Sequence, residues 1–190
     1  FPLVTAKKMI EAELELPVST IFSEFSEPVA AASIAQVHRA RLADTGEEVA
    51  VKVLRPGIER AFRKDIDAFY LAARWIERLA PFSRRLRPVE VIQHFEGVVM
   101  GELDLRLESS SAAEFAANTA KDEGFQVPKP QWFLSSRNVM TLGWAEGIGL
   151  NDNDLIDAAG HDRRVLGARV LQLFLNHALR DGFFHADMHQ

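Results

Sequence analysis

Alternating apolar and polar residues predict two adjacent β-strands in the first third of the chain. In Glu48–Leu54 the three valines face one side of the strand, whereas Ala50, Lys52 and Leu54 face the other. An alanine-rich stretch comes before the preceding strand, and a D-T-G turn at residues 44–46 joins the two strands. The pattern therefore predicts an antiparallel hairpin that presents one lysine on its less apolar face.

Steps of three and four between apolar residues predict helices elsewhere in the chain. Ile58–Ala80 is expected to be one amphipathic helix, and Val89–Ala117 a longer one that bends at Gly97 or Gly101. The apolar residues of the longer helix are expected to form a buried stripe: Val91, Phe95 and Val98 or Val99. The other expected elements are helices over Thr5–Leu16, 151–159 and 161–180, a strand over Ser19–Phe25, and a hairpin of Gln131–Leu134 with Asn138–Trp144.

The order of these elements predicts an α+β fold of two lobes with a cleft between them. An antiparallel-sheet lobe with inserted helices is expected over residues 1–147, and the start of a helical lobe over 148–190. Gly147 and Gly149 loosen the connector between them. With 190 residues, 47% of them hydrophobic, the chain can bury one sizeable core or two small ones.

Composition and charge narrow the class of partner. A net charge of −5 gives no reason to expect nucleic acid, and the absence of cysteine excludes disulfides and thiolate zinc sites. No run approaches the ~20 apolar residues needed to span a bilayer. One basic cluster (Arg78, Arg84, Arg85 and Arg87) is interpreted as a solvated loop, with a lipid or anion patch as the alternative.

Lys52 is the first candidate for chemistry. A flat base fits over the small Ala50 while its phosphates reach the ammonium group; the alternative is a solvated lysine in an ordinary hairpin. Three acids of the long helix are candidate partners. Asp104 and Glu108, four residues apart, are expected on one face, and Glu102 is expected to continue the apolar stripe and point inward. Solvated helix acids are the alternative for this group.

The end of the chain reads H-A-D-M-H, from His185 to His189. Two imidazoles and the carboxylate of Asp187 at a spacing of two can converge on zinc or iron. In the other interpretation this is a catalytic loop, in which Asp187 orients a nucleophile and His185 packs as a scaffold. The motif by itself leaves both interpretations open.

The combination of motifs is more specific than any one of them. A hairpin with V-A-V-K, a helix glutamate, a hinge-like strand and H-x-D after a helix follow the order of parts in protein kinases. Two departures stand out: alanines replace the glycines of the phosphate loop, and H-A-D replaces H-R-D. With these departures the chain resembles the UbiB family of atypical kinase-like proteins, through AAASIAQVH at 30–38, VAVKVLRPG at 49–57, ELDLRLE at 102–108 and FFHADMHQ at 183–190.

The resemblance implies a protein-kinase-like fold and a role for each matched residue. Lys52 corresponds to the invariant lysine, Glu108 to its ion-pair partner and Asp187 to the catalytic base. Glu102 and Asp104 match the regulatory E-x-D acids, which in the family face an N-terminal K-x-G-Q segment. Trp144 and Ala145 would offer backbone groups to adenine. The loop that covers the nucleotide phosphates corresponds to Val29, Ala30, Ala31, Ala32, Ser33, Ile34, Ala35, Gln36 and Val37.

The resemblance also implies ligands, partners and a location. Family members bind ATP or ADP with Mg²⁺, support ubiquinone biosynthesis, and act as ATPases or lipid-directed kinases. Expected partners are ubiquinone-pathway proteins or prenyl-lipid intermediates. The expected location is the cytoplasmic face of a bacterial inner membrane or its organellar equivalent.

We expect the chain to be a fragment that lacks the K-x-G-Q segment, the D-F-G part and the parent's membrane attachment. The magnesium ligands are therefore expected after Gln190, with none within the fragment, and the fragment alone is expected to have no turnover. A non-catalytic nucleotide- or lipid-binding module on a kinase scaffold is the alternative function.

Overall fold

The computed structural model describes residues 1–184, apart from the side chains of residues 81, 83 and 84. The chain forms two compact units. The first contains Phe1–Ser111 and Pro130–Gly143, and the second contains residues 112–129 and the chain from Trp144 onward. The predicted division into lobes at residues 147 and 148 stays a prediction.

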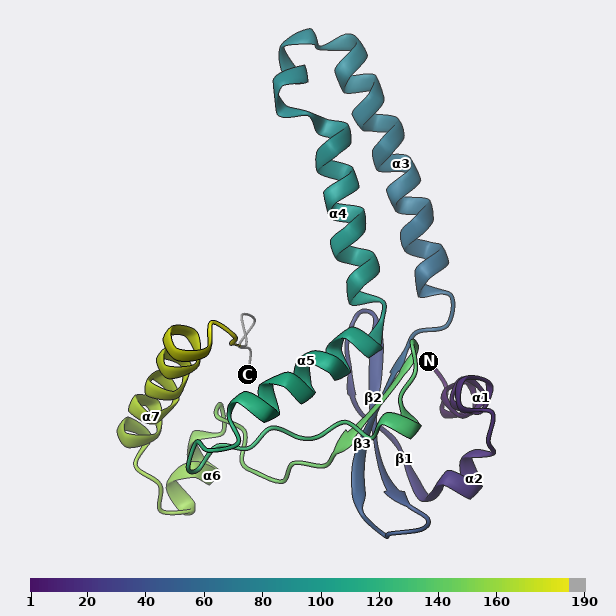
Figure 1. Ribbon diagram of the computed structural model, residues 1–190. Helices are drawn as coiled ribbons and strands as arrows, with labels where there is room; N and C mark the ends of the chain where they lie inside the picture. Colours follow the sequence, from purple (N-terminus) through teal and green to yellow (C-terminus); the bar gives the residue numbers. More distant parts are fainter. Residues whose placement is uncertain (185–190) are drawn as a thin grey trace. The chain divides into compact units, whose positions relative to one another are not determined.

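A four-stranded antiparallel sheet is the centre of the first unit (Figure 1). Its strands, in spatial order, are β1 (Phe22–Ala31), β2 (Ala35–Leu42), β3 (Glu48–Leu54) and β4 (Val139–Gly143). The predicted hairpin is thus β2 and β3, and the α+β fold class is confirmed. Pro28 lies within β1, an edge strand, where the pairing with β2 shifts register on both sides of it.

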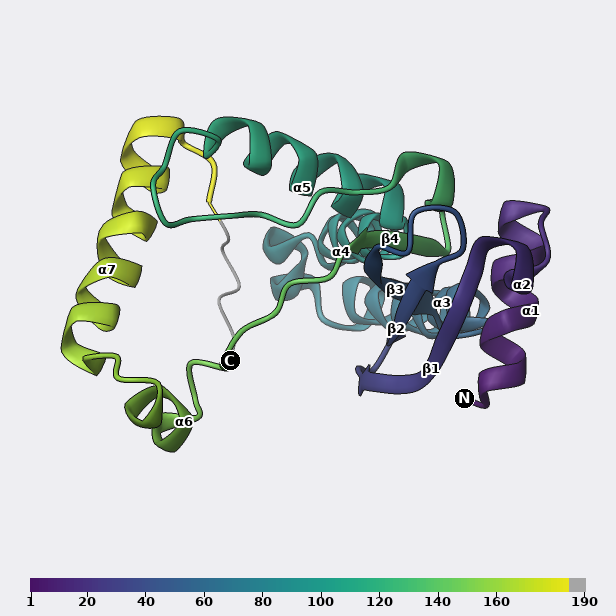
Figure 2. The same ribbon diagram turned by 90° about the horizontal axis from the view of Figure 1, so that it is seen from below.

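One face of the sheet is covered by α1 (Leu3–Leu14) and α2 (Val18–Ile21), as Figure 2 shows for α1. The three valines of β3 are fully buried there, together with Ile10 of α1. The prediction of a strand from Ser19 was wrong, because the chain makes a helical turn up to Ile21. The Glu11 carboxylate accepts a hydrogen bond at 3.0 Å from the amide of Val18 and so caps that turn.

His38 of β2 makes the stability of this core dependent on pH. The ring is fully buried and stacks on Phe25, and its Nε2 has no hydrogen-bond partner among residues 1–184. Burial lowers the pKa of His38 below 6.5, although the Ser26 carbonyl at 3.0 Å partly opposes this. A folded-state pKa below the unfolded one stabilises the protein above about pH 6.5, and that contribution is lost as the pH falls toward the lowered pKa.

We therefore expect the urea midpoint of unfolding to fall between pH 7.5 and pH 5, and His38→Asn to flatten this dependence. His94→Asn is the matched control, since His94 is exposed on α4. A His38→Asn protein with the pH profile of the wild type would contradict the assignment.

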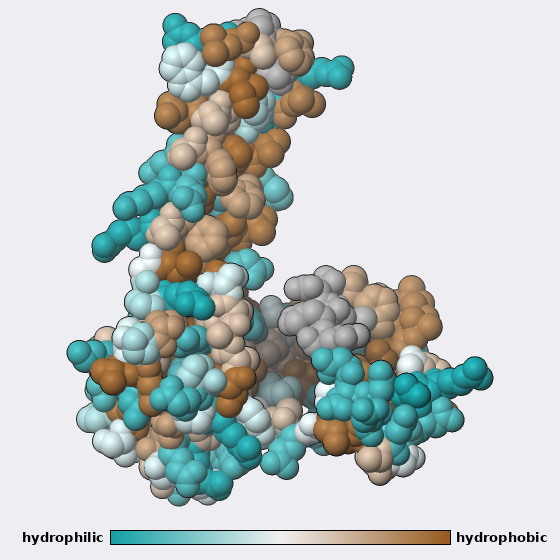
Figure 3. Space-filling view, turned by 180° about the vertical axis from the view of Figure 1, so that it is seen from behind, coloured by the Kyte–Doolittle hydropathy of each residue, from teal (hydrophilic) through white to brown (hydrophobic). Residues whose placement is uncertain are grey.

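A helical hairpin is inserted between β3 and β4: α3 (Ile58–Leu79), the 3₁₀ segment η1 (Pro81–Leu86) and α4 (Pro88–Glu102). Tyr70 donates a hydrogen bond to Glu96 at 2.8 Å, and Phe69 and Phe95 meet edge to face. The predicted buried stripe of α4 was wrong: Val91 is 58% exposed and Phe95 41%. Two helices alone share only one narrow contact face, and apolar side chains remain on the hairpin surface (Figure 3).

The predicted single helix over Val89–Ala117 is two helices, α4 and α5 (Leu105–Asn118). Leu103 and Leu105 are both buried, at 1% and 0% exposure, and on one straight helix they would point about 200° apart. A break between them lets both enter the interior. Asp104 stabilises the break, because its carboxylate accepts from the amide of Arg106 at 3.2 Å.

The rest of the chain follows the predictions in part. The segment predicted as a strand over Gln131–Leu134 contains the 3₁₀ turn η2 (Trp132–Leu134). The second unit contains α6 (Asn153–Ala158), which is capped by Asp152, and α7 (Arg163–Asn176). A π-helical turn, η3 (His177–Asp181), continues α7, and Gly182 then ends it with a positive φ of 63°. None of the helices within residues 1–184 is long and apolar enough to cross a membrane.

Candidate nucleotide site

The face of the sheet opposite α1 carries Lys52. In the antiparallel register Lys52 lies between Val37 of β2 and Met140 of β4, and directly opposed residues point to the same side. Ala50, two residues before Lys52 on the same face of β3, is flanked in the same way by Arg39 and Leu142. Val37, Ala50 and Leu142, which are half-buried, and Met140, which is buried, form an apolar floor beside the ammonium group. Arg39 lies on the same face and forms an ion pair with Glu48.

Helix α5 places Glu108 against Lys52. Its first residue, Leu105, is fully buried on this face of the sheet among Ala35, Leu54 and Met140. Glu108 follows three residues later, nearly one turn on, and therefore lies on the side of the helix that faces the sheet. Both of its carboxylate oxygens lie 2.7 Å from Lys52 Nζ. The structure thus brings together two of the three residues predicted to be catalytic.

The Lys52–Glu108 pair has a larger effect on geometry than on stability. The two side chains are 27% and 45% exposed, and ion pairs this open to water contribute about 0–1 kcal/mol. The neighbouring pairs of Glu48 with Arg39 and Arg41 fall in the same class. The pair instead fixes one rotamer of a long cation above the apolar floor.

The predicted phosphate-covering loop is shorter than the sequence suggested. Within Val29–Val37, the residues up to Ala31 belong to β1 and those from Ala35 onward to β2, which leaves a tip of Ala32, Ser33 and Ile34. Ala35 and Gln36 are buried in the sheet, whereas Ala32 and Ser33 at the tip are exposed. The Ala32 amide donates to the Ala35 carbonyl at 2.9 Å and closes the tip.

Arg55 holds this tip, and the sequence motifs did not single it out. Its Nε and Nη2 donate to the Ala32 carbonyl at 3.2 and 3.0 Å, and its amide donates to the Ile34 carbonyl at 2.7 Å. The signal in the sequence is weak: an arginine two residues before a glycine, at the end of a strand. Only the pairing of β2 with β3 shows that it reaches the tip.

The regulatory acids Glu102 and Asp104 do not lie as predicted. Glu102 is exposed at the end of α4 and does not point inward. Asp104 lies in the break and does not share a helical face with Glu108. It forms a two-pronged ion pair with Arg106, at 2.9 and 2.6 Å, which lowers the pKa of Asp104. Their regulatory role stays a prediction.

The remaining predicted site residues belong to the second unit. Trp144 and Ala145 directly follow β4, Trp144 half-buried and Ala145 exposed, and their contact with adenine stays a prediction. Asp187, His185 and His189 lie outside the described residues, so the choice between a metal site and a catalytic loop stays open there. Up to residue 184, no group of three or more His, Asp or Glu side chains is arranged to hold a metal ion.

Comparisons with known proteins show which family this chain is similar to. The family model of the ABC1 atypical kinase-like domain matches residues 1–190. A protein of Marinobacter nauticus named "Probable protein kinase UbiB" is 39% identical over 190 residues, and proteins of the same name from Aliivibrio fischeri and Klebsiella pneumoniae are 40% and 41% identical over 185 and 186 residues. These matches cover 97–100% of the chain but only 34–35% of the relatives.

The chain thus spans about a third of the length of the curated relatives that it matches. Their agreement over nearly every residue confirms the resemblance noted in the sequence. The chain belongs to the family of ABC1 atypical kinase-like domains and is similar to the proteins named UbiB.

Proposed function

We propose that the sheet face around Lys52 binds ATP or ADP as part of an atypical kinase or ATPase. The observation that supports this most directly is the Lys52–Glu108 ion pair, with Nζ 2.7 Å from both carboxylate oxygens. A cation held in one position over an apolar floor matches a nucleotide, whose base has flat, apolar faces and whose phosphates are negative.

In the proposed reaction, Lys52 neutralises charge on the α- and β-phosphates, and Glu108 keeps the ammonium group in place. The backbone of Ala31–Ser33, in which the Ala32 amide already donates to the Ala35 carbonyl, approaches the phosphates. Asp187 accepts the proton of the attacking hydroxyl group or water. Phosphoryl transfer depends mainly on positioning and electrostatics. These groups therefore need to be placed accurately, and none of them has to form a covalent bond with the substrate.

Magnesium is the expected companion of the nucleotide and would neutralise phosphate charge when bound. The described residues include no group of three or more His, Asp or Glu side chains that could hold it. The proposed roles are therefore those of protein groups alone.

The family resemblance connects the proposal to a pathway. By family, we infer that the complete protein supports ubiquinone biosynthesis, together with ubiquinone-pathway proteins or prenyl-lipid intermediates, at the cytoplasmic face of a bacterial inner membrane or an organellar equivalent. A regulatory module that binds nucleotide or lipid without turnover is the second candidate. The alanines at 30–32 and the tip that Arg55 pins favour it, because methyl groups restrict the close phosphate approach that glycines allow.

The proposal is tested with the complete protein by calorimetric titration of ADP and ATP and by phosphate release with and without magnesium. We expect binding of both nucleotides and magnesium-dependent hydrolysis or transfer. Binding without any turnover would favour the regulatory module. Absence of nucleotide binding would contradict the proposed nucleotide site and leave only the lipid-binding form of the second candidate.

We expect Arg55→Met to change the affinity of the complete protein for ADP by about threefold to tenfold. Two hydrogen bonds from a charged donor to one carbonyl are lost, on the order of 1 kcal/mol at an accessible site, and the tip loosens. Arg60→Met is the matched control, since Arg60 is exposed on the first turn of α3. Equal affinities in both variants would show that the tip does not contact the nucleotide.

A further inference from the structure

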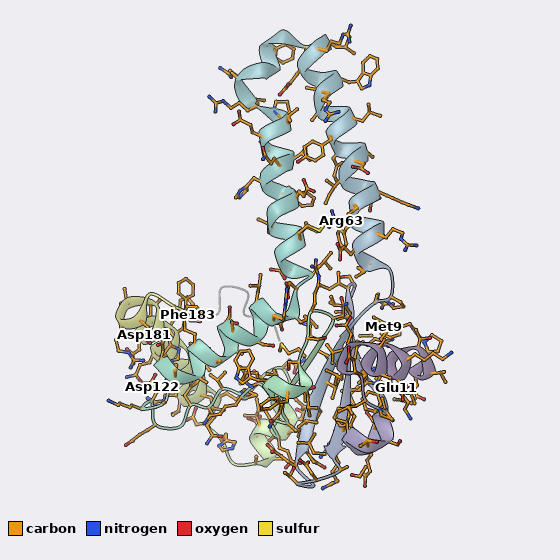
Figure 4. All side chains as sticks on the ribbon, turned by 45° about the vertical axis from the view of Figure 1, so that its right-hand side comes forward. Met9, Glu11, Arg63, Asp122, Asp181 and Phe183 are labelled. Carbon is orange, nitrogen blue, oxygen red and sulfur yellow. The ribbon has the colours of Figure 1, made fainter. Side chains whose placement is uncertain are left out.

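A cluster of charged side chains lies in the second unit, apart from the predicted nucleotide contacts. Asp122 accepts hydrogen bonds from Arg180 Nη1 and Nη2 at 2.7 and 2.9 Å, and its Oδ2 lies 2.9 Å from Nε2 of His177. Arg180 also donates to both carboxylate oxygens of Asp181 at 2.7 Å. One guanidinium group thus joins two carboxylates, and Figure 4 shows Asp122, Asp181 and Phe183 in this region.

The two carboxylates and the imidazole of the cluster are mostly shielded from water, whereas the Arg180 side chain is 47% exposed. His177 is 3% exposed, and the side chains of Asp122 and Asp181 are 12% and 13% exposed. The rings of Phe115 and Phe125 lie 5.1 and 4.8 Å from the His177 ring. By contrast, the ion pair between Asp157 and Arg163 in the same unit is more than half exposed on both sides.

Shielding and charge-assisted hydrogen bonds make this cluster stronger than a surface ion pair. The hydrogen bonds that the Asp122 carboxylate accepts from Arg180, together with the one it accepts from His177, lower the pKa of Asp122 to about 2. Removing the Arg180 guanidinium would leave the shielded carboxylates of Asp122 and Asp181 without their shared cation, which costs more than an exposed pair contributes.

Three members of the cluster belong to the turn that ends α7. His177 is the first residue of the π-helical turn η3, and Arg180 and Asp181 are its last two. π-Helical turns are rare and occur often at functional sites, and this one is held by side-chain contacts to Asp122 from a different part of the chain. Gly182 then turns the chain with a positive φ.

The residues after the turn are also fixed by packing. The ring of Phe183 lies 5.9 Å from that of Phe115, and the ring of Phe184 lies 5.3 Å from that of Phe174, edge to face. Phe115 therefore contacts both His177 and Phe183, and joins the charged cluster to the outgoing chain. In the sequence, His185 and Asp187 follow directly.

We propose that Asp122, His177 and Arg180 are positioning residues that fix where the chain leaves α7, and thereby where Asp187 is presented. The inference rests on the proposed function, because that function gives Asp187 its part in phosphoryl transfer. It adds residues that are not among the predicted nucleotide contacts, and that act through the turn and Phe183.

The test is Asp122→Asn in the complete protein, with Asp157→Asn as the matched control in an exposed pair of the same unit. We expect Asp122→Asn to lower kcat about tenfold and leave the Kd for ADP within twofold of the wild type. The control is expected to change neither. A merely structural role would instead lower kcat, nucleotide binding and thermal stability together, and would overturn the proposal.

A second measurement does not depend on activity. Hydrogen exchange of peptides covering residues 183–190 is expected to be faster in Asp122→Asn than in the wild type and the control. Unchanged exchange would overturn the proposal even if the protein hydrolyses ATP. If the wild type shows no turnover, the proposed function fails, and the exchange result still decides the role of the cluster.

Arg180→Lys serves if Asp122→Asn does not fold. It keeps the positive charge but removes the two-pronged contact with Asp122. We expect kcat to fall and exchange of residues 183–190 to rise, each by less than in Asp122→Asn. Wild-type kcat and wild-type exchange in Arg180→Lys would contradict a positioning role.

Discussion

Replacing Lys52 with alanine is expected to lower ATP turnover by the complete protein at least ~100-fold. Losing one preorganised charge that faces developing negative charge typically costs two to three orders of magnitude in rate. The free energy of unfolding is expected to change by less than about 1 kcal/mol, because the Lys52–Glu108 pair is partly open to water. Phosphate release and urea unfolding measured on the same preparation separate the two effects.

The control for this variant is Lys64→Ala, which removes an exposed lysine from α3. Glu108→Gln is expected to follow Lys52→Ala in direction with a smaller loss, since the cation remains but is held less firmly. Undiminished turnover in Lys52→Ala would contradict the assignment of this sheet face as the nucleotide site.

The largest stability effect is expected from Ile10→Ala on α1. Ile10 is fully buried against the valines of β3, and truncating such a residue costs about 2–5 kcal/mol through lost burial and the cavity that remains. Helix α1 covers the face of the sheet opposite Lys52, so the loss loosens the support of β3 and not the nucleotide contacts themselves. Urea unfolding measures the change.

Val4→Ala is the matched control, because Val4 lies on the same helix but is 64% exposed. Its expected change is within about 0.5 kcal/mol. Equal effects of the two substitutions would mean that α1 does not pack on the sheet through Ile10.

The β2–β3 hairpin and its lysine were predictable because strand alternation is a local signal. The valines of β3 and the opposing Lys52 face the sides that the pattern assigned to them. The pairing with Glu108, 56 residues away, was inferred through the family resemblance, and the structure places the two side chains in contact. For the Lys52–Glu108 pair, the local strand pattern and the order of the motifs were sufficient to predict the contact.

Other elements depended on contacts that the local sequence does not reveal. The helical turn before β1 is capped by Glu11 from the preceding helix, and the break before α5 occurs because Leu103 and Leu105 both need burial. Asp104 as a helix cap was the available local signal for that break. The Arg55 clamp and the Asp122–Arg180 contact join residues 23 and 58 positions apart, where sequence spacing carries no information.

The break at Leu103–Asp104 also bears on how this part of the protein can change in evolution. In one continuous helix, inserting a single residue in α4 would rotate Glu108 by about 100° around the axis and remove it from Lys52. Because α5 begins anew at Leu105, anchored by its own buried leucine, whole turns can be added to or deleted from the α3–α4 hairpin without such a rotation. The α3–α4 hairpin can therefore vary in length among related proteins while Glu108 keeps its contact with Lys52.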